Sequence, residues 1–357
     1  MNAYRSTRST RIHRAWEVLK YILLWGLGLA LLYLAFANQD FSDIQAILWN
    51  ADYSWMSIIL VITVANHIIR AYRWKMLLKP LGHHLSLFNA FVALMFGYLV
   101  HYAVPRLGEI SRCAALNKSE DIPFQQSFGT VLTERVIDVI CLLLLICLAF
   151  VLEYQVISEF FIENMLLPIF SGLQKVLHTS KLVIGLAAFL FLGGLGVLVY
   201  YGKRITATDR MDSLIEFLRK MWQGMISIWY IKSKGLFILY TIIIWVFYVL
   251  MTYLWFFSFT QTLHLSIRAG IVMSVIGSLG RLVPVQGGGM GAYHFLFAHG
   301  LLLYGVSQEY GGAMAILVHG FQTVYYLAIG GMATLVVMFQ KKQGTSAKSW
   351  KNLWHMK

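Results

Sequence analysis

The chain has 357 residues, of which 59% are hydrophobic and only 13% are charged. The charged fraction is about half that of soluble domains, and long apolar runs recur along the whole chain, which excludes a soluble globular domain. The runs are continuous rather than alternating, which also excludes a transmembrane β-barrel. The sequence therefore predicts an all-α polytopic membrane protein.

The formal net charge of +13 comes from basic residues in short segments beside the apolar runs. This placement indicates membrane topology and attraction to anionic lipid head groups, and it argues against nucleic-acid binding. The three cysteines have no CxxC spacing, so neither a disulfide framework nor a metal site is indicated. The glycines of 287–291 contain a GxG spacing but lack a surrounding βαβ unit, so no cofactor is expected.

The N-terminus places Arg5, Arg8, Arg11 and Arg14 before an apolar run that ends at Ala37. This pattern imitates a secretory signal, but the run is longer than the apolar core of a signal peptide. We therefore expect a basic cytoplasmic segment at 1–17 and a retained first helix.

Lys and Arg mark the cytoplasmic side of membrane proteins, and here they give the direction of each predicted helix. We predict a single transmembrane domain over 18–339, with about six spanning helices, cytoplasmic termini and a basic tail at 340–357. The predicted spans are 18–37, 54–72, 127–152, 181–201, 235–259 and 312–339. Two amphipathic stretches, 153–180 and 211–229, are expected to lie along the membrane surfaces.

Two further apolar stretches fit the charge pattern only if each enters and leaves on the same face of the membrane. We predict re-entrant helix hairpins at about 85–117 and 266–305, broken by Pro105 and Pro284, because proline disfavours helix at the preceding residue. The hairpins would enter from opposite faces, as in inverted-repeat transporters. The alternative is eight plain spanning helices, which places the basic residues after 104 outside.

Residues beside the two breaks are the first candidate site. Arg106 and Arg281 adjoin the breaks, and the planar fork of arginine binds two phosphate oxygens at once. The glycine amides of the second break could form an anion-binding nest. The predicted substrate is an amphiphile with an anionic, phosphate-bearing head. The predicted substrate-binding residues are Arg106, Arg281, Pro105, Gly108, Pro284, Gly287, Gly288, Gly289 and Gly291.

A second group of charged residues is predicted to form a gating network at the cytoplasmic mouth. Asp138 lies inside an apolar run, where an unpaired acid is costly. The predicted network comprises Arg70, Arg73, Glu109, Arg112, Glu134, Arg135, Asp138 and His294. The alternatives are snorkelling cations at Arg70 and Arg73, a surface ion pair between Glu109 and Arg112, and a hydrogen-bonded helix histidine at His294.

In chain order, four stretches resemble the flippase-like transmembrane domain of lysylphosphatidylglycerol synthases and its stand-alone relatives. They are Arg70 to Trp74, Gly97 to Arg112 around Pro105 and Gly108, Glu134-Arg135 with Asp138, and Pro284 with Gly287, Gly288 and Gly291. The resemblance implies movement of a lipid across the bacterial cytoplasmic membrane. The chain departs from the family where His294 replaces a usual acid. It also lacks the aminoacyl-transferase domain after its last helix, so lysylphosphatidylglycerol synthesis is not expected.

The expected function is translocation or binding of an anionic phospholipid or lipid-linked precursor in the bacterial cytoplasmic (inner) membrane, without enzymatic chemistry. A homo-oligomer is compatible with the sequence. One alternative is a membrane-embedded enzyme that uses Glu109, Glu134 and Asp138 as acid/base groups or metal ligands. The other is a non-transporting membrane scaffold.

Overall fold

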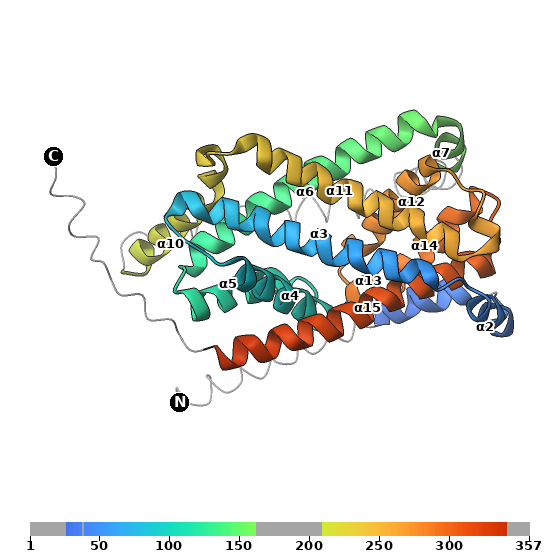
Figure 1. The fold of residues 1–357 in the computed structure, drawn as a ribbon, viewed down its shortest axis with the longest axis horizontal. Helices are drawn as coiled ribbons and strands as arrows, with labels where there is room; N and C mark the ends of the chain where they lie inside the picture. Colours follow the sequence, from blue (N-terminus) through green and yellow to red (C-terminus); the bar gives the residue numbers. More distant parts are fainter. Residues whose placement is uncertain (1–25, 38, 162–208, 341–357) are drawn as a thin grey trace, which may run out of the picture.

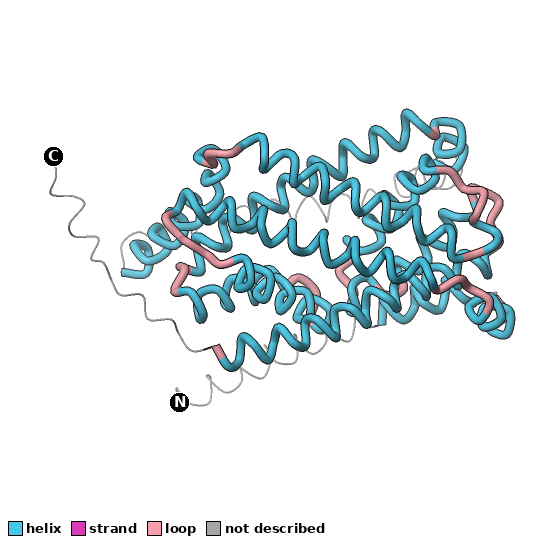
Figure 2. The backbone as a smooth tube through the Cα atoms, viewed as in Figure 1, coloured by secondary structure: helices cyan, strands magenta, loops and turns pink. Residues whose placement is uncertain are grey.

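A computed structural model describes residues 26–37, 39–161 and 209–340 of the chain. The described residues form helices joined by short loops, with no strand among them (Figures 1 and 2). Most of the long helices run roughly along the long axis of the molecule (Figure 1). The predicted all-helical class is therefore confirmed over this part of the chain.

Four described helices are long and apolar enough to cross a membrane. They correspond to four of the six predicted spans, and the predicted span at 181–201 lies outside the described residues. The predicted first span is described only from Gly26, as the helix Gly26–Phe36. The four are α3 (Ser54–Leu78, continued by η1 Lys79–Leu81), α6 (Phe124–Leu152), α11 (Lys234–Trp255) and α15 (Gln308–Phe339).

The other labelled helices outside the two hairpins are α2 (Phe41–Trp49), α7 (Tyr154–Phe161), α10 (Asp209–Ile226), η3 (Ser227–Tyr230), η4 (Phe256–Ser258) and η5 (Thr260–Thr262). The stretch predicted as an amphipathic helix at 211–229 is α10 and η3. α10 packs closely on α6, because a Cβ at Gly129 would lie 2.0 Å from the carbonyl oxygen of Met221. Of the stretch predicted at 153–180, only α7 falls within the described residues.

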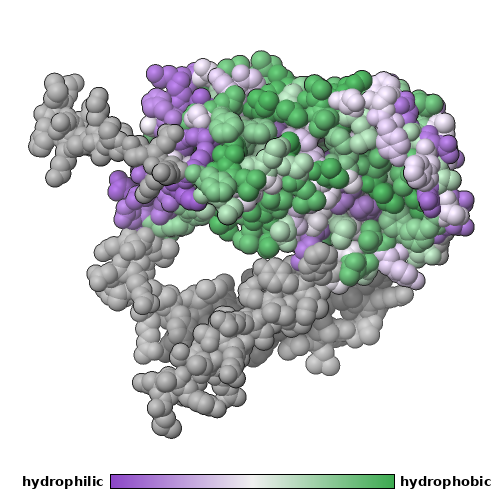
Figure 3. Space-filling view, turned by 60° about the horizontal axis from the view of Figure 1, so that its bottom comes forward, coloured by the Kyte–Doolittle hydropathy of each residue, from purple (hydrophilic) through white to green (hydrophobic). Residues whose placement is uncertain are grey.

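Apolar side chains cover much of the outside of the molecule. On α6, Val136, Val139, Ile140, Leu143 and Leu144 are each more than half exposed. A hydrophobic region separates hydrophilic ends on the face that Figure 3 shows. An exposed apolar surface of this kind suits contact with lipid tails and, together with four candidate spans, indicates a multi-pass membrane protein.

The first broken stretch folds as two antiparallel helices, α4 (Leu87–Ala103) and α5 (Leu107–Glu120). Val104 is extended where Pro105 follows it, and Arg106 has a φ of 65°, so the chain reverses within three residues. The helices cross at glycines: a Cβ on Gly108 would lie 2.5 Å from the carbonyl oxygen of Gly97.

The open ends of this hairpin meet at one end of the molecule. The amide of Asn89 donates to the carboxylate of Glu120, and Gln340 Nε2 donates to Asn89 Oδ1 at 2.9 Å. Gln340 directly follows α15, so the hairpin begins and ends where α15 ends.

The second broken stretch contains α12 (Ile267–Leu282), α13 (Gln286–Gly289) and α14 (Ala292–Leu302). Gly287 and Gly288 have left-handed φ values of 64° and 68°, which favour glycine. The end of this hairpin away from the break is where the chain enters α12 and leaves α14. Just outside it, the backbone N–H of Ser307 donates to Gln261 Oε1 at 3.1 Å, beside the start of α15. The second hairpin therefore opens toward the end of the molecule opposite to the first.

The two breaks meet inside the molecule. A Cβ on Gly288 would lie 2.8 Å from the ring of Tyr102, the penultimate residue of α4. His319 of α15 bonds through Nε2 to the carbonyl oxygen of Gly287 at 2.7 Å. In Figure 1, α4 and α5 lie in the half of the molecule that contains α10, whereas α12 and α14 lie in the other half.

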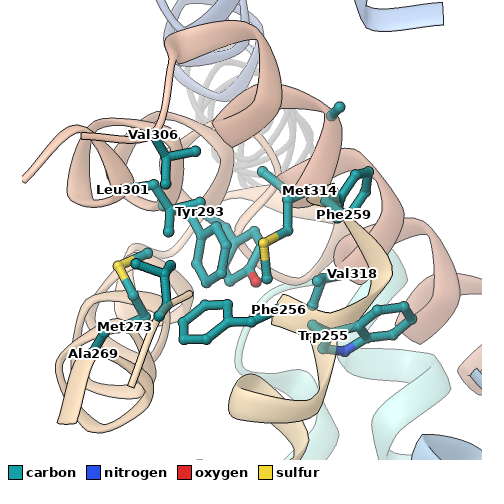
Figure 4. Packing of buried hydrophobic residues seen from close by; sticks show 14 of the residues in the cluster. Trp255, Phe256, Phe259, Ala269, Met273, Tyr293, Leu301, Val306, Met314 and Val318 are labelled. Carbon is teal, nitrogen blue, oxygen red and sulfur yellow. The ribbon is translucent and has the colours of Figure 1, made fainter. Parts of the chain in front are cut away.

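Each hairpin has its own apolar core. One core, part of which Figure 4 shows, packs α12 and α14 against α11 and α15 through residues such as Trp255, Tyr293 and Met314. The other packs α4 and α5 against α3 and α6 around Trp74 and Leu116. Lipid tails are themselves apolar, so dense packing and buried polar contacts, rather than removal of surface from water, stabilise such cores in a membrane.

Candidate functional site

Three helices bring six charged side chains together in the interior. Arg70 and Arg73 lie one turn apart on α3, Arg112 lies on α5, and α6 supplies Glu134, Arg135 and Asp138. These six residues are called the arginine cluster below. The spacings of three and four residues place each helix's contributions on one face, so the packing of α3, α5 and α6 makes them converge.

Arg73 and Arg112 make the shortest ion pairs in the arginine cluster. Arg73 Nη2 lies 2.8 Å from Asp138 Oδ1 and 3.5 Å from Glu134 Oε1. Arg112 Nη2 lies 2.6 Å from Glu134 Oε2. The side chains of Arg73 and Glu134 are 0% exposed, so these charges are removed from solvent and each depends on its partner.

The two remaining arginines approach the second carboxylate. Arg70 Nη2 lies 3.7 Å from Asp138 Oδ2, and Arg135 Nη2 lies 3.5 Å from the same oxygen. The side chain of Arg70 is 8% exposed, whereas that of Arg135 is 42% exposed. Arg135 is therefore the most exposed member of the cluster.

Positive charge exceeds negative charge in the arginine cluster. Four guanidinium groups face two carboxylates, which leaves two formal positive charges without a counterion among the described residues. The Nε atoms of all four arginines, Nη1 of Arg112 and the hydroxyl of Tyr98 are buried without a hydrogen-bond partner. Unpartnered buried donors are rare in proteins, so this cluster is suited to a ligand rich in acceptors.

Aromatic and hydroxyl side chains hold the guanidinium groups in place. The guanidinium of Arg70 lies 5.5 Å from the ring centroid of Tyr98 and donates to the hydroxyl of Tyr248. The guanidinium of Arg112 lies 4.6 Å from the ring of Trp74, whose Nε1 donates to Thr130 Oγ1 at 2.9 Å. Cation–π contacts compensate part of the desolvation cost and fix the positions of the arginines.

The arginine cluster lies well inside a candidate span. Glu134 and Asp138 are the eleventh and fifteenth of the 29 residues of α6, about 15 and 21 Å along the helix from its first residue. Val136 and Val139, on the same part of α6, are each 54% exposed. Arg135 therefore reaches the surface beside side chains that suit contact with lipid.

A second polar group surrounds the break after α12. The guanidinium of Arg281 lies 4.7 Å from the ring of Tyr293, and the rings of His294 and His319 lie 4.8 Å apart. Gln286 is 2% exposed, and neither atom of its amide has a hydrogen-bond partner in the described part of the chain. This group is called the Arg281 group below.

A series of aromatic rings connects the arginine cluster with the Arg281 group. Tyr98 stacks on Tyr326 at 4.8 Å between centroids, Tyr326 lies 5.2 Å from Tyr102, and Tyr102 lies 6.3 Å from His319. His67 Nε2 lies 3.1 Å from the hydroxyl of Tyr326. These residues, called the tyrosine track below, line the interior with hydroxyl and imidazole groups where the two hairpins meet.

Arg106 and Glu109 lie apart from the arginine cluster. Arg106 is exposed in the turn between α4 and α5, where its backbone N–H donates to His101 Nδ1 at 3.2 Å. Glu109 makes no ion pair with any described residue, and its predicted place in the gating network stays a prediction. The alternative surface pair with Arg112 is wrong, because Arg112 lies on the buried face of α5 and contacts Glu134.

The snorkelling alternative for Arg70 and Arg73 is wrong as well. Arg73 and Trp74 are 0% exposed and Arg70 is 7% exposed, so α3 turns these residues inward. His294 accepts a hydrogen bond from the backbone N–H of Gly291 at 3.3 Å, as the alternative for that residue expects.

The glycines of the second break serve close packing. A Cβ on Gly289 would lie 3.0 Å from the Cα of Arg281, and a Cβ on Gly291 would lie 2.2 Å from the carbonyl oxygen of Gly28. The Cβ position of Gly288 is occupied by Tyr102, and the carbonyl oxygen of Gly287 is engaged by His319. These contacts show that the glycines allow close packing. Their predicted role as an anion-binding nest depends on backbone N–H groups and stays a prediction, and Pro284 lies exposed beside the break.

Sequence reasoning missed the aromatic residues of the site. Tyr98, Tyr102, Tyr248 and Tyr326 lie in apolar runs where tyrosines are common, and their partners come from other helices. A tyrosine inside a predicted span is a weak signal, since its hydroxyl needs a partner there, but it does not identify that partner.

Long apolar helices, an exposed apolar surface and buried charges held between helices define a multi-pass α-helical membrane protein. Comparison with known proteins agrees with this class. The chain belongs to the family described as the lysylphosphatidylglycerol synthase TM region, whose model matches residues 18–330. The family predicted from the sequence is thereby confirmed.

The chain is also similar to the UPF0104 membrane protein MJ1595 of Methanocaldococcus jannaschii. The two are 33% identical over 122 residues, which cover 33% of this chain and 35% of that protein. The match thus spans about a third of the relative's length. No solved structure matches the chain.

Proposed function

We propose that this protein binds an anionic phospholipid or lipid-linked precursor and moves it across the bacterial cytoplasmic membrane. The observation that carries the proposal is the excess of two positive charges in the arginine cluster, within the length of the candidate spans. Uncompensated charge at membrane depth is costly, and it is retained where it binds a substrate or an ion. The family description names a region of a phospholipid synthase, which supports a lipid as the substrate.

In this proposal, six spanning helices surround two re-entrant hairpins. α4 has 17 residues and α12 has 16, so each is about 25 Å long and shorter than the hydrocarbon core of a bilayer. The opposite openings of the hairpins and the contact between Gly288 and Tyr102 support entry from opposite faces. Irregular backbone at this depth is tolerated where it is buried in protein or lines a water-filled cavity.

The end of the molecule that holds the open end of α4 and α5 faces the cytoplasm in this proposal. Lys79 and Lys118 lie at that end, and Asp40 and Asp52 flank α2 at the other. The predominance of basic residues on the cytoplasmic side supports this orientation, which also places both chain termini in the cytoplasm.

The head group would reach the arginine cluster beside Arg135 while its acyl chains stay in the bilayer against Val136 and Val139. Arg281 is a half-buried cation farther along the interior, and the tyrosine track lies between it and the arginine cluster. Tyrosine hydroxyls can hydrogen-bond phosphate oxygens without adding charge that would trap the substrate. Arg106 is placed to attract anionic head groups to the turn of the first hairpin.

We propose a transport role rather than an enzymatic one. Each carboxylate of the arginine cluster contacts at least two guanidinium groups, which favours ion pairing over a role in acid/base catalysis or metal binding.

Reconstitution in liposomes tests this function. The purified protein is incorporated with fluorescent phosphatidylglycerol, and a membrane-impermeant quencher reports how much label reaches the outer leaflet. We expect rapid exchange with wild-type protein and at least about tenfold slower exchange with Arg112→Gln or Arg281→Gln, because each removes a cation from the path. Arg268→Gln, at an exposed position on α12, is the matched control. Absence of exchange, or equal exchange in all variants, would contradict the proposal.

A further inference from the structure

We propose that the arginine cluster selects a lipid whose head is a phosphate monoester, carrying up to two negative charges, over a phosphodiester lipid that carries one. The inference rests on the proposed function and identifies the substrate class of the same site. Three features of the arginine cluster support it: its charge, its unpartnered donors and its access from the lipid-facing surface.

The charge of the cluster matches a doubly charged head group. Arginine stays protonated in proteins, and each carboxylate of the cluster contacts at least two guanidinium groups, so the formal charges are four positive and two negative. No other acidic side chain in the described ranges forms an ion pair with these arginines. A ligand with two negative charges neutralises the excess, whereas a ligand with one leaves a buried positive charge uncompensated.

The unpartnered donors match three phosphate oxygens. A phosphate monoester presents three terminal oxygens, and a diester presents two. The donors without a partner are Nε and Nη1 of Arg112, the Nε atoms of Arg70, Arg73 and Arg135, and the hydroxyl of Tyr98. A third oxygen allows more of these donors to be satisfied, and hydrogen bonds to charged groups are the strong ones.

Access to the cluster suits a lipid. Arg135 is 42% exposed and adjoins the exposed Val136 on α6, whereas Arg73 and Glu134 are closed to solvent. A phosphate attached directly to an apolar anchor can approach Arg135 from the bilayer while its anchor remains among the exposed side chains of α6. Free inorganic phosphate has the same charge but lacks that anchor.

The test compares two lipids that differ by one methyl group. Binding of dioleoyl phosphatidate, a monoester, and dioleoyl phosphatidylmethanol, a diester, is measured by native mass spectrometry of the full chain in detergent at about pH 8, where the monoester is almost fully doubly charged. We expect the wild-type protein to bind the monoester at least about tenfold more tightly, because the second charge acts in a site of low effective dielectric. Inorganic phosphate is expected not to compete.

A charge variant assigns the preference to the arginine cluster. Arg135→Gln lowers the excess to one positive charge, and we expect the preference for the monoester to fall to about twofold or less. Arg268→Gln should retain the full preference. Thermal unfolding of each variant verifies folding, and the wild-type comparison of the two lipids needs no variant.

The outcomes separate this inference from the proposed function. Equal binding of the two lipids, with lipid exchange intact in liposomes, overturns the selectivity and leaves transport standing. Failure of both lipids to bind overturns both. A monoester preference that persists in Arg135→Gln overturns the assignment of selectivity to the arginine cluster.

Discussion

Of the charges in the arginine cluster, we expect removal of the Glu134 charge to destabilise the protein most. Its carboxylate lies 2.6 Å from Arg112 and 3.5 Å from Arg73, and its side chain is 0% exposed. Glu134→Gln keeps the shape of the side chain but removes its charge. Four buried or partly buried guanidinium groups would then face one carboxylate, so the excess rises from two positive charges to three.

The magnitude follows from the burial of both partners. Removing one partner of a buried ion pair destabilises proteins by about 3–5 kcal/mol, because the other charge stays buried and unpaired. We expect Glu134→Gln to lower the free energy of unfolding by this amount. Glu109→Gln removes an acid of the same type that forms no ion pair with the described residues and is half-buried, so a change of about 0.5 kcal/mol or less is expected.

Unfolding of the purified protein in mixed micelles, followed by circular dichroism against increasing denaturing detergent, measures both changes. The double variant Glu134→Gln/Arg112→Gln also removes the guanidinium that loses its carboxylate partner in Glu134→Gln. Its loss of free energy of unfolding should therefore be at least about 1 kcal/mol smaller than the sum of the two single losses. The reasoning would be refuted if Glu134→Gln were no more destabilising than Glu109→Gln, or if the two changes in the double variant simply added.

Two further predictions concern the hairpins. Gly108→Ala should destabilise the protein by about 1–3 kcal/mol in the same assay, because its Cβ would lie 2.5 Å from the carbonyl oxygen of Gly97. The control Gly331→Ala, whose Cβ would meet nothing within 4 Å, should be neutral or stabilising. Equal effects of the two substitutions would contradict the close crossing of α4 and α5. In a chain with its native cysteines replaced, Arg268→Cys should react with a membrane-impermeant thiol reagent in intact cells and Lys118→Cys only after permeabilisation. Labelling of both from one side would contradict the opposite entry of the hairpins.

The breaks of the fold could be predicted because their causes are local. Pro105 and Pro284 act on the residues directly before them, and the helices end at Ala103 and Leu282. The C-terminal end of α3 was harder to predict. The sequence predicts a span that ends near residue 72, where arginines accumulate. The helix continues to Leu78, and Arg70 and Arg73 lie within it and contact Asp138 on α6.

The membership of the site was only partly predictable. Glu134 and Asp138 stand out in the sequence because charge is rare in apolar runs, and Arg112 stands out as one of the charged residues that follow Pro105. Which of them pair depends on how α3, α5 and α6 pack, and Arg73 and Asp138 are 65 residues apart in the chain. The sequence therefore directed attention to Arg106, beside a conspicuous proline, whereas the structure places Arg106 at the surface and Arg112 inside.

The central claim is that a lipid phosphate binds among the arginines of α3, α5 and α6. An experimental structure of the protein in nanodiscs that contain phosphatidate tests it most directly. We predict density for a phosphate group within about 4 Å of the guanidinium groups of Arg70, Arg112 and Arg135. A well-resolved structure in which ordered lipid phosphates lie only at the membrane surfaces, and water alone contacts these arginines, would contradict it.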